Sequence, residues 1–332
     1  MKNNSAPFFS IIIPCYNAAS FVNKALHALE LQTFSDFEII LVDDCSTDNT
    51  YEYCRRWAEN STLLVTLLRN KENSGPGASR SWGLRHAKGR FVGFCDSDDW
   101  YEPDLLELAY SKIQSEKAEL VFFDFYRCFS DNHRMKVGSL SNFCKCKKKE
   151  DFIALSTDSL CSLLIKKTLL EKVPMANLYN AEDVVTVPLF VAEAERISFL
   201  NRPLYNYQYR LCSLSTHSNK RVVNNFLKAY SFLVAHKKQE YDAAFEFHCI
   251  KLVIYGAFYN AIRCGMKRKI LRRMLDNFEK YHSNWRQNPF LKYLPKRKRF
   301  WMFCINHNSF SVLHIYCKLH SIYLQLRLKK FL

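Results

Sequence analysis

Two short apolar runs flank a helical pattern in residues 8–44, which read FFSIIIPCYNAASFVNKALHALELQTFSDFEIILVDD. The runs at 8–13 and 37–42 are mostly apolar and rich in β-branched and aromatic residues, as in strands buried on both faces. Between them, apolar residues recur at helical spacing over residues 20–31. This stretch therefore predicts a strand, a helix and a second strand, in that order.

The alternation of strand and helix patterns continues to residue 125. The next predicted elements are a helix at 49–59, a strand at 63–68, a helix that opens at the Gly-Pro-Gly turn of residues 75–77 and ends at Gly89, a strand at 91–95, a helix at 103–117 and a strand at 119–125. Strands that alternate with helices in this way form sheets in which most strands are parallel. We therefore expect an α/β fold with a mixed, mostly parallel sheet flanked by helices.

The rest of the chain follows a different pattern. From the sequence we expect a polar, basic surface loop at 130–150, mostly helix at 158–195, β-structure at 197–209, and helices at 222–282 and 305–330. Strand signals fade after residue 220. The sequence thus predicts a C-terminal region that is mainly helical.

The composition is that of a globular protein. A chain of 332 residues corresponds to one large domain or two ordinary ones, and its 48% hydrophobic and 24% charged residues exclude a disordered chain. The 13 Cys include no C-x-x-C pair, and the N-terminal residues lack the apolar stretch of a signal peptide. No apolar run approaches the roughly 18 residues of a membrane span. We therefore expect a cytoplasmic protein with reduced thiols.

Positive charge is concentrated in the C-terminal part. The net charge of +16 is made up of −4 over residues 1–200 and +20 over residues 201–332. Basic runs at 267–273 and 296–299 accompany a helical face of apolar residues at 312–326. This combination favours peripheral docking on an anionic membrane surface, at the inner face of the cell membrane. The alternative is a helical subdomain with solvated charges; a nucleic-acid partner is not expected, because no nucleic-acid module is present.

Acidic clusters follow two of the predicted strands. Residues 43–44 read DD and residues 96–99 read DSDD. In open α/β sheets, ligands bind at the carboxyl ends of the strands. Carboxylates this close repel one another unless a cation or hydrogen-bond donors neutralise them, and an all-oxygen cluster suits Mg²⁺ or Mn²⁺. The alternative is a solvated turn with helix-capping aspartates.

The motifs in residues 8–130 resemble those of the family-2 glycosyltransferases of bacterial surface-polysaccharide type, which have the GT-A fold. Their order is P-x-Y-N, Q-T, V-D-D-x-S-x-D, G-x-x-x-x-R, A-x-G and D-S-D-D. The resemblance extends more loosely to residue 215. It implies a GT-A domain at 1–215, with a nucleotide-sugar half at 8–130 and an acceptor half at 131–215, followed by a helical basic region at 216–332.

The resemblance implies a nucleotide site at the carboxyl ends of the first strands. Asp44 would hydrogen-bond the base, and Pro14 and Tyr16 would line its pocket. Arg80 would sit near the nucleotide, because its forked donors suit phosphate or base oxygens. The alternatives are a surface helix charge for Arg80 and a half-buried core aromatic for Tyr16.

The resemblance also implies roles for the aspartates of the DSDD segment. Asp96 would approach the ribose or a metal-bound water, and Asp98 would ligate a divalent metal, Mn²⁺ or Mg²⁺, that bridges the diphosphate. Asp99 would cap the next segment or support the site.

A second carboxylate must take the proton from the acceptor hydroxyl. The resemblance assigns this role to Asp183, with Glu182 as support or acceptor contact, and it implies an inverting reaction. The alternative is that this Glu-Asp pair only caps a helix. Arg210, in the segment Tyr205–Arg210, is a further candidate for a contact with the diphosphate. Residues 162–167 are a degraded form of a K-L-Y-R-like family segment, which leaves the acceptor open.

Together these features predict a hexosyl- or N-acetylhexosaminyltransferase of EC 2.4 type. We expect a UDP-linked donor and a glycan acceptor, lipid-linked, in the synthesis of lipopolysaccharide, capsule or exopolysaccharide. Two alternatives are a non-catalytic carbohydrate- or nucleotide-binding protein on the same scaffold and a nucleotidyltransferase. The latter usually carries a Gly-rich loop near the first strand, where this chain has Pro-Cys-Tyr-Asn at 14–17. The sequence indicates no oligomeric state.

Overall fold

The computed structural model describes residues 6–130, 133–138, 145–178, 180–210 and 218–329, with side chains up to residue 322. The chain forms two compact units. The first comprises Met1–Lys145, Thr157–Tyr179 and Glu193–Tyr209, and the second comprises Cys146–Ser156, Asn180–Ala192 and Arg210–Leu332. The expected boundary at residues 215–216 lies outside the described residues.

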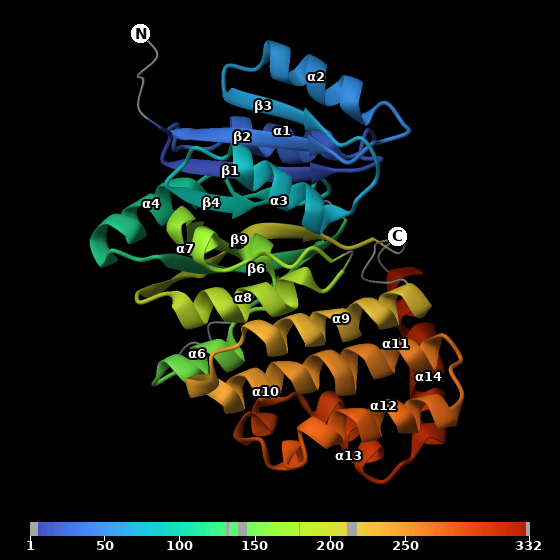
Figure 1. Cartoon of the computed structure of the whole chain (residues 1–332). Helices are drawn as coiled ribbons and strands as arrows, with labels where there is room; N and C mark the ends of the chain where they lie inside the picture. Colours follow the sequence, from blue (N-terminus) through green and yellow to red (C-terminus); the bar gives the residue numbers. More distant parts are fainter. Residues whose placement is uncertain (1–5, 131–132, 139–144, 179, 211–217, 330–332) are drawn as a thin grey trace. The chain divides into compact units, whose positions relative to one another are not determined.

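A nine-stranded mixed sheet forms the centre of the first unit (Figure 1). Its strands are β1 (Phe9–Cys15), β2 (Phe37–Asp43), β3 (Leu64–Arg69), β4 (Phe91–Phe94), β5 (Trp100–Tyr101), β6 (Leu120–Ser130), β7 (His133–Val137), β8 (Leu163–Lys166) and β9 (Ile197–Gln208). The order is β3-β2-β1-β4-β8-β6-β9-β5, and β7 pairs with β6. Strands β1 to β4 are mutually parallel, β6 is parallel to β9, and β8 runs antiparallel to its neighbours β4 and β6. The predicted α/β fold with a mixed, mostly parallel sheet is confirmed.

Helices flank this sheet, because the apolar faces of the helices and of the sheet must be buried against each other. They are α1 (Val22–Glu30), α2 (Thr50–Asn60), α3 (Pro76–His86), α4 (Leu105–Glu116) and α7 (Lys167–Lys172). Helix α3 packs on β1 and β2, and α4 packs on β6 and β9. Gly83 explains how closely α3 approaches the sheet, because a Cβ at this position would stand only 2.6 Å from the Ile12 side chain.

Two sequence-based predictions were wrong in this unit. Residues 133–137 form strand β7 within the expected surface loop, and residues 163–166 form strand β8 where helix was expected. All side chains of β7 except Val137 are exposed, so β7 has no apolar pattern to reveal it. Strand β8 is a short apolar run whose conformation is set by β4 and β6, far away in the sequence.

The second unit is helical, as predicted for the C-terminal region. Its helices are α6 (Lys149–Leu155), α8 (Glu182–Glu193, whose last residue belongs to the first unit), α9 (Lys220–His236), α10 (Asp242–Ile250), a π-helical segment (Lys251–Ala257), α11 (Phe258–Arg263), α12 (Arg268–Tyr281), α13 (Lys296–Asn306) and α14 (Phe310–Lys329). Among the largest fully buried side chains are Trp285, Trp301 and Phe258. The Trp301 indole donates a hydrogen bond to the backbone carbonyl of Ile254, at 2.7 Å, within the π-helical segment. In the portion of the chain that the structure describes, no helix is long and apolar enough to cross a membrane.

Candidate active site

The turns after β1 and β2 lie side by side at the carboxyl edge of the sheet. The parallel register pairs Cys15 with Asp43, and the Asp44 amide donates to the Cys15 carbonyl at 2.7 Å. Asn17 Oδ1 accepts a hydrogen bond from the Thr47 amide at 2.9 Å, which ties the two turns together. These bonds define one rigid edge on which ligand-binding side chains can be placed.

Pro14 and Tyr16 differ in their surroundings. Pro14 is buried within β1, opposite Val42 of β2. Tyr16 is the first residue after the strand, and its side chain is 45% exposed at the edge of the sheet. The Tyr16 ring is therefore accessible to a ligand, whereas Pro14 lies within the strand, and the roles expected of both residues in a base pocket stay predictions.

The Asp44 carboxylate holds the loop that leads into α3. Its Oδ1 accepts hydrogen bonds from Asn70 Nδ2 at 2.5 Å and the Ser74 amide at 3.0 Å, and its Oδ2 accepts from the Gly75 amide at 2.7 Å. Gly75 has a φ of 88°, a conformation that glycine adopts without strain. Asp44 is thus a positioning residue for this loop, and its contact with a nucleotide base stays a prediction.

Arg80 projects from α3 to the turn after β4. Its Nη2 atom lies 2.5 Å from Asp96 Oδ1. The side chain of Arg80 is buried, whereas that of Asp96 is 35% exposed. The alternative of a surface helix charge for Arg80 is therefore wrong. A buried guanidinium beside a half-exposed carboxylate orients that carboxylate and places positive charge where an anionic ligand can approach.

Asp99 is the buried anchor of the same turn. Its Oδ2 accepts a hydrogen bond from the Tyr205 hydroxyl at 2.5 Å, and its Oδ1 accepts from the Gln208 amide at 2.7 Å. Burial raises the pKa of Asp99 well above its ordinary value, and the nearby charges of Asp98 and Asp96 raise it further. Asp99 therefore supports the turn, as expected, while Asp96 and Asp98 remain partly exposed.

The carboxylates of this turn suit a divalent cation. Among the described residues, no group of three or more His, Cys, Asp or Glu side chains is arranged to hold a metal ion alone. Mg²⁺ and Mn²⁺ need fewer, since they bind through one or two carboxylates together with substrate phosphates and water. Asp98 and Asp96 present partly exposed carboxylates on one short turn. The donor set therefore fits a metal shared with a bound diphosphate.

Glu182 and Asp183 begin α8 in the second unit. Glu182 is buried, and Asp183 is partly exposed, with its Oδ1 accepting a hydrogen bond from the Val184 amide at 2.9 Å. This bond at the first turn of a helix matches the capping alternative. Arg210 is the first residue of the third segment of this unit, next to residues 211–217, which lie outside the described residues.

Tyr205 is the main site residue that the sequence did not assign. It belongs to the aromatic segment 205–210, in which a role was assigned from the sequence only to Arg210. Its bonds to Asp99 and to the Asp96 amide join residues that are more than a hundred positions apart. The one sequence signal for this contact is the β-pattern of residues 197–209, which predicts that alternate side chains of β9 lie on the same face of the sheet.

Comparison with known proteins places this geometry in context. Residues 10–174 match the model of Glycosyl transferase family 2. Glycosyltransferase GlyA of Streptococcus pneumoniae serotype 4 is 29% identical over 218 residues, which cover 62% of this chain and 31% of GlyA. Putative glycosyltransferase EpsH of Bacillus subtilis is 25% identical over 248 residues, covering 70% of this chain and 71% of EpsH. The chain thus spans less than a third of GlyA but most of EpsH.

Solved structures share the fold. The crystal structure of Staphylococcus aureus TarS has a TM-score of 0.64 at 22% identity, over 82% of this chain and 49% of TarS. The mannosyltransferase PcManGT from Pyrobaculum calidifontis, in complex with GDP-Man and Mn²⁺, has a TM-score of 0.57 at 19% identity, over 96% of this chain and 88% of PcManGT. At these identities the likeness shows the GT-A fold.

Proposed function

Because the chain belongs to glycosyl transferase family 2, we propose that it transfers a sugar from a nucleotide-sugar donor to a hydroxyl group of a glycan acceptor. The observation that carries this proposal is the acidic turn after β4, in which Asp96 pairs with buried Arg80 and Asp99 is anchored by Tyr205. This turn lies at the carboxyl edge of parallel strands, where open α/β sheets bind ligands.

The proposed donor is UDP-linked, with an N-acetylhexosamine or a hexose as the sugar. Support comes from poly(ribitol-phosphate) beta-N-acetylglucosaminyltransferase TarS of Staphylococcus aureus, which is 35% identical over 34% of this chain. A crystal structure of TarS 1–349 holds UDP-GlcNAc. Tyr16 would stack on or flank the uracil, and Arg80 would face the nucleotide from α3.

Asp98, with Asp96, would hold a divalent cation next to the diphosphate. When bound, such a cation offsets the negative charge that grows on the leaving nucleotide. Arg80 fixes the orientation of Asp96, and the Tyr205–Asp99 bond fixes the turn that carries both ligands. The Mn²⁺ in PcManGT supports the choice of manganese.

Asp183 would act as the general base of an inverting reaction. It is a partly exposed carboxylate at the N-terminal end of α8, where the helix dipole stabilises its ionised form. A base must be ionised to accept the proton of the acceptor hydroxyl, so this position suits the role. Buried Glu182 would support the first turn of the helix, and Arg210 would contact the diphosphate.

The proposed acceptor is a surface or cell-wall glycan built at the inner face of the cell membrane. Names of relatives support this class: TuaG of Bacillus subtilis is named as a putative teichuronic acid biosynthesis glycosyltransferase, and GgaB as a minor teichoic acid biosynthesis protein. Within this class, lipopolysaccharide, capsule and exopolysaccharide remain the proposed products.

A donor screen tests the proposal. The full chain is incubated with Mn²⁺ and, in turn, with UDP-, GDP- and dTDP-linked sugars, and release of free nucleotide is followed by NMR. We expect slow hydrolysis of one UDP-sugar in the absence of acceptor and none of the GDP- or dTDP-sugars. If no nucleotide binds or is released under any of these conditions, the proposal fails.

A further inference from the structure

Helix α14 exposes an apolar face. Val312, Ile315, Leu319 and Ile322 recur at steps of three and four residues, so they share one side of the helix, and their side chains are 43%, 60%, 61% and 52% exposed. On the other side, Leu313 and Cys317 are buried, where α14 packs on α11 and α13. The exposed face therefore does not take part in the packing that holds α14 against α11 and α13.

Helix α13 extends this apolar face and adds cations to it. The rings of Phe300 on α13 and Tyr316 on α14 lie 6.4 Å apart, and Arg297 Nη1 lies 3.0 Å from His320 Nε2. Phe300 and Phe303 are both exposed, and as neighbours three residues apart they lie on adjacent turns of the same helix face. Apolar surface thus continues from α14 across Phe300 to Phe303.

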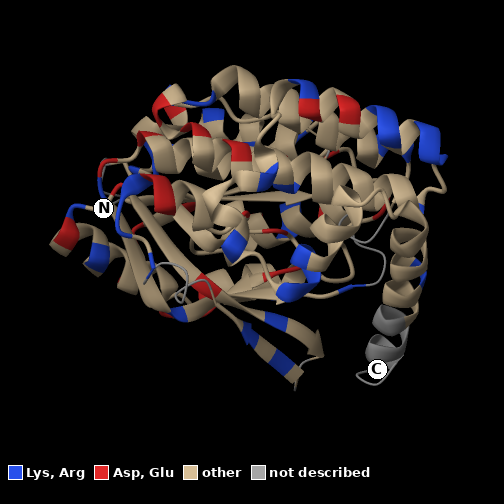
Figure 2. Ribbon diagram, turned by 90° about the horizontal axis from the view of Figure 1, so that it is seen from below, with Lys and Arg blue, Asp and Glu red and all other residues tan. Residues whose placement is uncertain are grey.

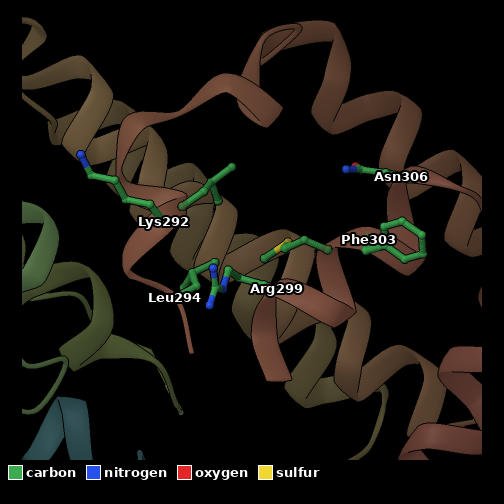
Figure 3. A pocket seen from close by; sticks show the side chains of 7 residues that line it. Lys292, Leu294, Arg299, Phe303 and Asn306 are labelled. Atoms are coloured by element: carbon green, nitrogen blue, oxygen red, sulfur yellow. The ribbon is translucent and has the colours of Figure 1, made fainter. Parts of the chain in front are cut away.

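Beyond Phe303 the surface is hollowed. A cavity of about 270 Å³ is lined mainly by apolar atoms. Its lining residues are Leu291, Lys292, Leu294, Arg299, Met302, Phe303 and Asn306 (Figure 3). Lys292 and Arg299 bring positive charge to the same hollow as the apolar side chains. We call the combined surface of α13, the exposed face of α14 and this cavity the α13–α14 face.

The positive charge of the α13–α14 face indicates what kind of partner it would bind. Glu279 is the last acidic residue of the sequence, whereas residues 280–322 carry eight Lys and Arg. In Figure 2 the described part of the helix that leads to the C-terminus carries no acidic residue. A second copy of this chain would bring two basic surfaces together, which is electrostatically unfavourable. A nucleic acid would match the charge but offers no apolar layer for Ile, Leu and Val side chains.

We propose that the α13–α14 face docks on an anionic phospholipid bilayer. The exposed apolar side chains would enter the boundary between headgroups and acyl chains, and Lys292, Lys296 and Arg299 would lie at the phosphates. The protein would then be held at the surface, in keeping with the absence of a spanning helix among the described residues. The inference goes beyond the proposed sugar transfer and does not depend on it, because vesicle binding requires neither donor nor acceptor.

The test is flotation of the full chain with vesicles. Vesicles of phosphatidylcholine mixed with phosphatidylglycerol are compared with vesicles of phosphatidylcholine alone. The apolar variant is Ile315→Ser/Leu319→Ser, and its control is Leu31→Ser/Leu64→Ser, two exposed leucines of the first unit. The charge variant is Lys296→Gln/Arg299→Gln, and its control is Lys88→Gln/Lys172→Gln, two exposed lysines of the first unit. All eight substitutions in these four variants fall on exposed side chains, and circular dichroism checks that each variant is folded.

We expect the wild type to float with the anionic vesicles, to bind neutral vesicles far less, and to be partly released by salt. The apolar variant should bind at least tenfold more weakly. Each cation removed should weaken binding by about fivefold. Both controls should bind like the wild type. The proposal is overturned if neutral vesicles bind equally well, or if the apolar variant binds like its control. It is also overturned if the wild type binds no vesicles and instead forms a dimer that the apolar variant breaks.

Discussion

The hydroxyl group of Tyr205 donates a hydrogen bond to Asp99 Oδ2 at 2.5 Å, and both side chains are buried. The same hydroxyl oxygen accepts a bond from the Asp96 amide at 3.3 Å. Strand β9 therefore holds the acidic turn after β4 at two points. These two bonds help to fix the turn that carries the partly exposed carboxylates of Asp96 and Asp98.

Tyr205→Phe should destabilise the protein by about 1–3 kcal/mol, because it deprives the buried Asp99 side chain of one of its two hydrogen-bond donors. Urea unfolding measures the free energy. Tyr53→Phe is the matched control, since the Tyr53 hydroxyl donates to Asn23 at an exposed position and its loss should cost less than about 0.5 kcal/mol. Equal stabilities for the two variants would show that the Tyr205–Asp99 bond does not hold the turn.

The cost of Tyr205→Phe should also increase with pH. Burial and the charges of Asp98 and Asp96 raise the pKa of Asp99, and the Tyr205 bond lowers it. A carboxyl whose pKa is raised by folding favours the folded state at low pH and loses that contribution as the pH rises through the folded pKa. Removing the bond raises that pKa further, so the variant should lose more stability at about pH 8 than at about pH 5. A cost that does not vary between these pH values would contradict the role of Asp99 charge.

Arg80→Lys should weaken binding of UDP by about tenfold, because an ammonium group keeps the charge but loses the planar fork that pairs with Asp96 and that we propose faces the nucleotide. Isothermal titration calorimetry with UDP and Mn²⁺ measures the affinity. Arg85→Lys, on the last turn of the same helix and exposed, should bind UDP like the wild type. An unchanged affinity in Arg80→Lys would remove Arg80 from the nucleotide site.

Asp183→Asn should lower sugar transfer by roughly 10²–10⁴-fold, the usual effect of losing a general base, while UDP binds as before. Asp242→Asn is the control, since Asp242 is an exposed acidic residue in the first turn of another helix of the same unit. If Asp183 only caps α8, both variants should lose some stability and keep their turnover. That result would leave the base unassigned.

His282 should make the second unit sensitive to mild acid. Its Nδ1 lies 3.3 Å from Glu246 Oε1 and its Nε2 lies 3.2 Å from the Tyr230 hydroxyl. Burial lowers the pKa of His282, although Glu246 acts in the opposite direction. The unfolded chain therefore binds a proton more readily, and stability should fall as the pH drops below about 6.5.

Thermal unfolding between about pH 7.5 and pH 5.5 measures this effect. His282→Gln should flatten the dependence of Tm on pH, whereas His27→Gln, at an exposed position of α1, should leave it unchanged. A slope that is the same in all three proteins would show that His282 does not titrate in this range.

The sequence predicted the parallel half of the sheet to within a few residues. Strands β1, β2 and β4 are buried along their whole length, so uninterrupted apolar runs mark them. It missed β8, because the same kind of run is ambiguous when it is short and its partners are distant in the sequence. It also missed β7, whose exposed polar side chains resemble those of a loop.

The candidate site was predictable to the extent that it lies in local motifs. Asp96, Asp98 and Asp99 follow one apolar strand, and this position beside a second acidic strand end led to the prediction of a cation site. The partners of these residues were not predictable, because the Arg80–Asp96 pair depends on how α3 packs and the Tyr205–Asp99 bond depends on the register of β9. Tertiary contacts of this kind leave no spacing pattern in the chain.

The most direct test of the account is the rate of UDP release from UDP-GlcNAc, or from the UDP-sugar that the donor screen selects, by the wild type and by Asp98→Asn with Mn²⁺. Asp98→Asn keeps the size of a side chain that is not part of the core and removes its charge. We expect release by the wild type that a chelator abolishes, and release at least a hundredfold slower in the variant. Asp36→Asn, an exposed aspartate just before β2 and outside the site, should release UDP at the wild-type rate. Full activity in Asp98→Asn, or in the wild type with chelator, would contradict a metal-dependent glycosyltransferase centred on this turn.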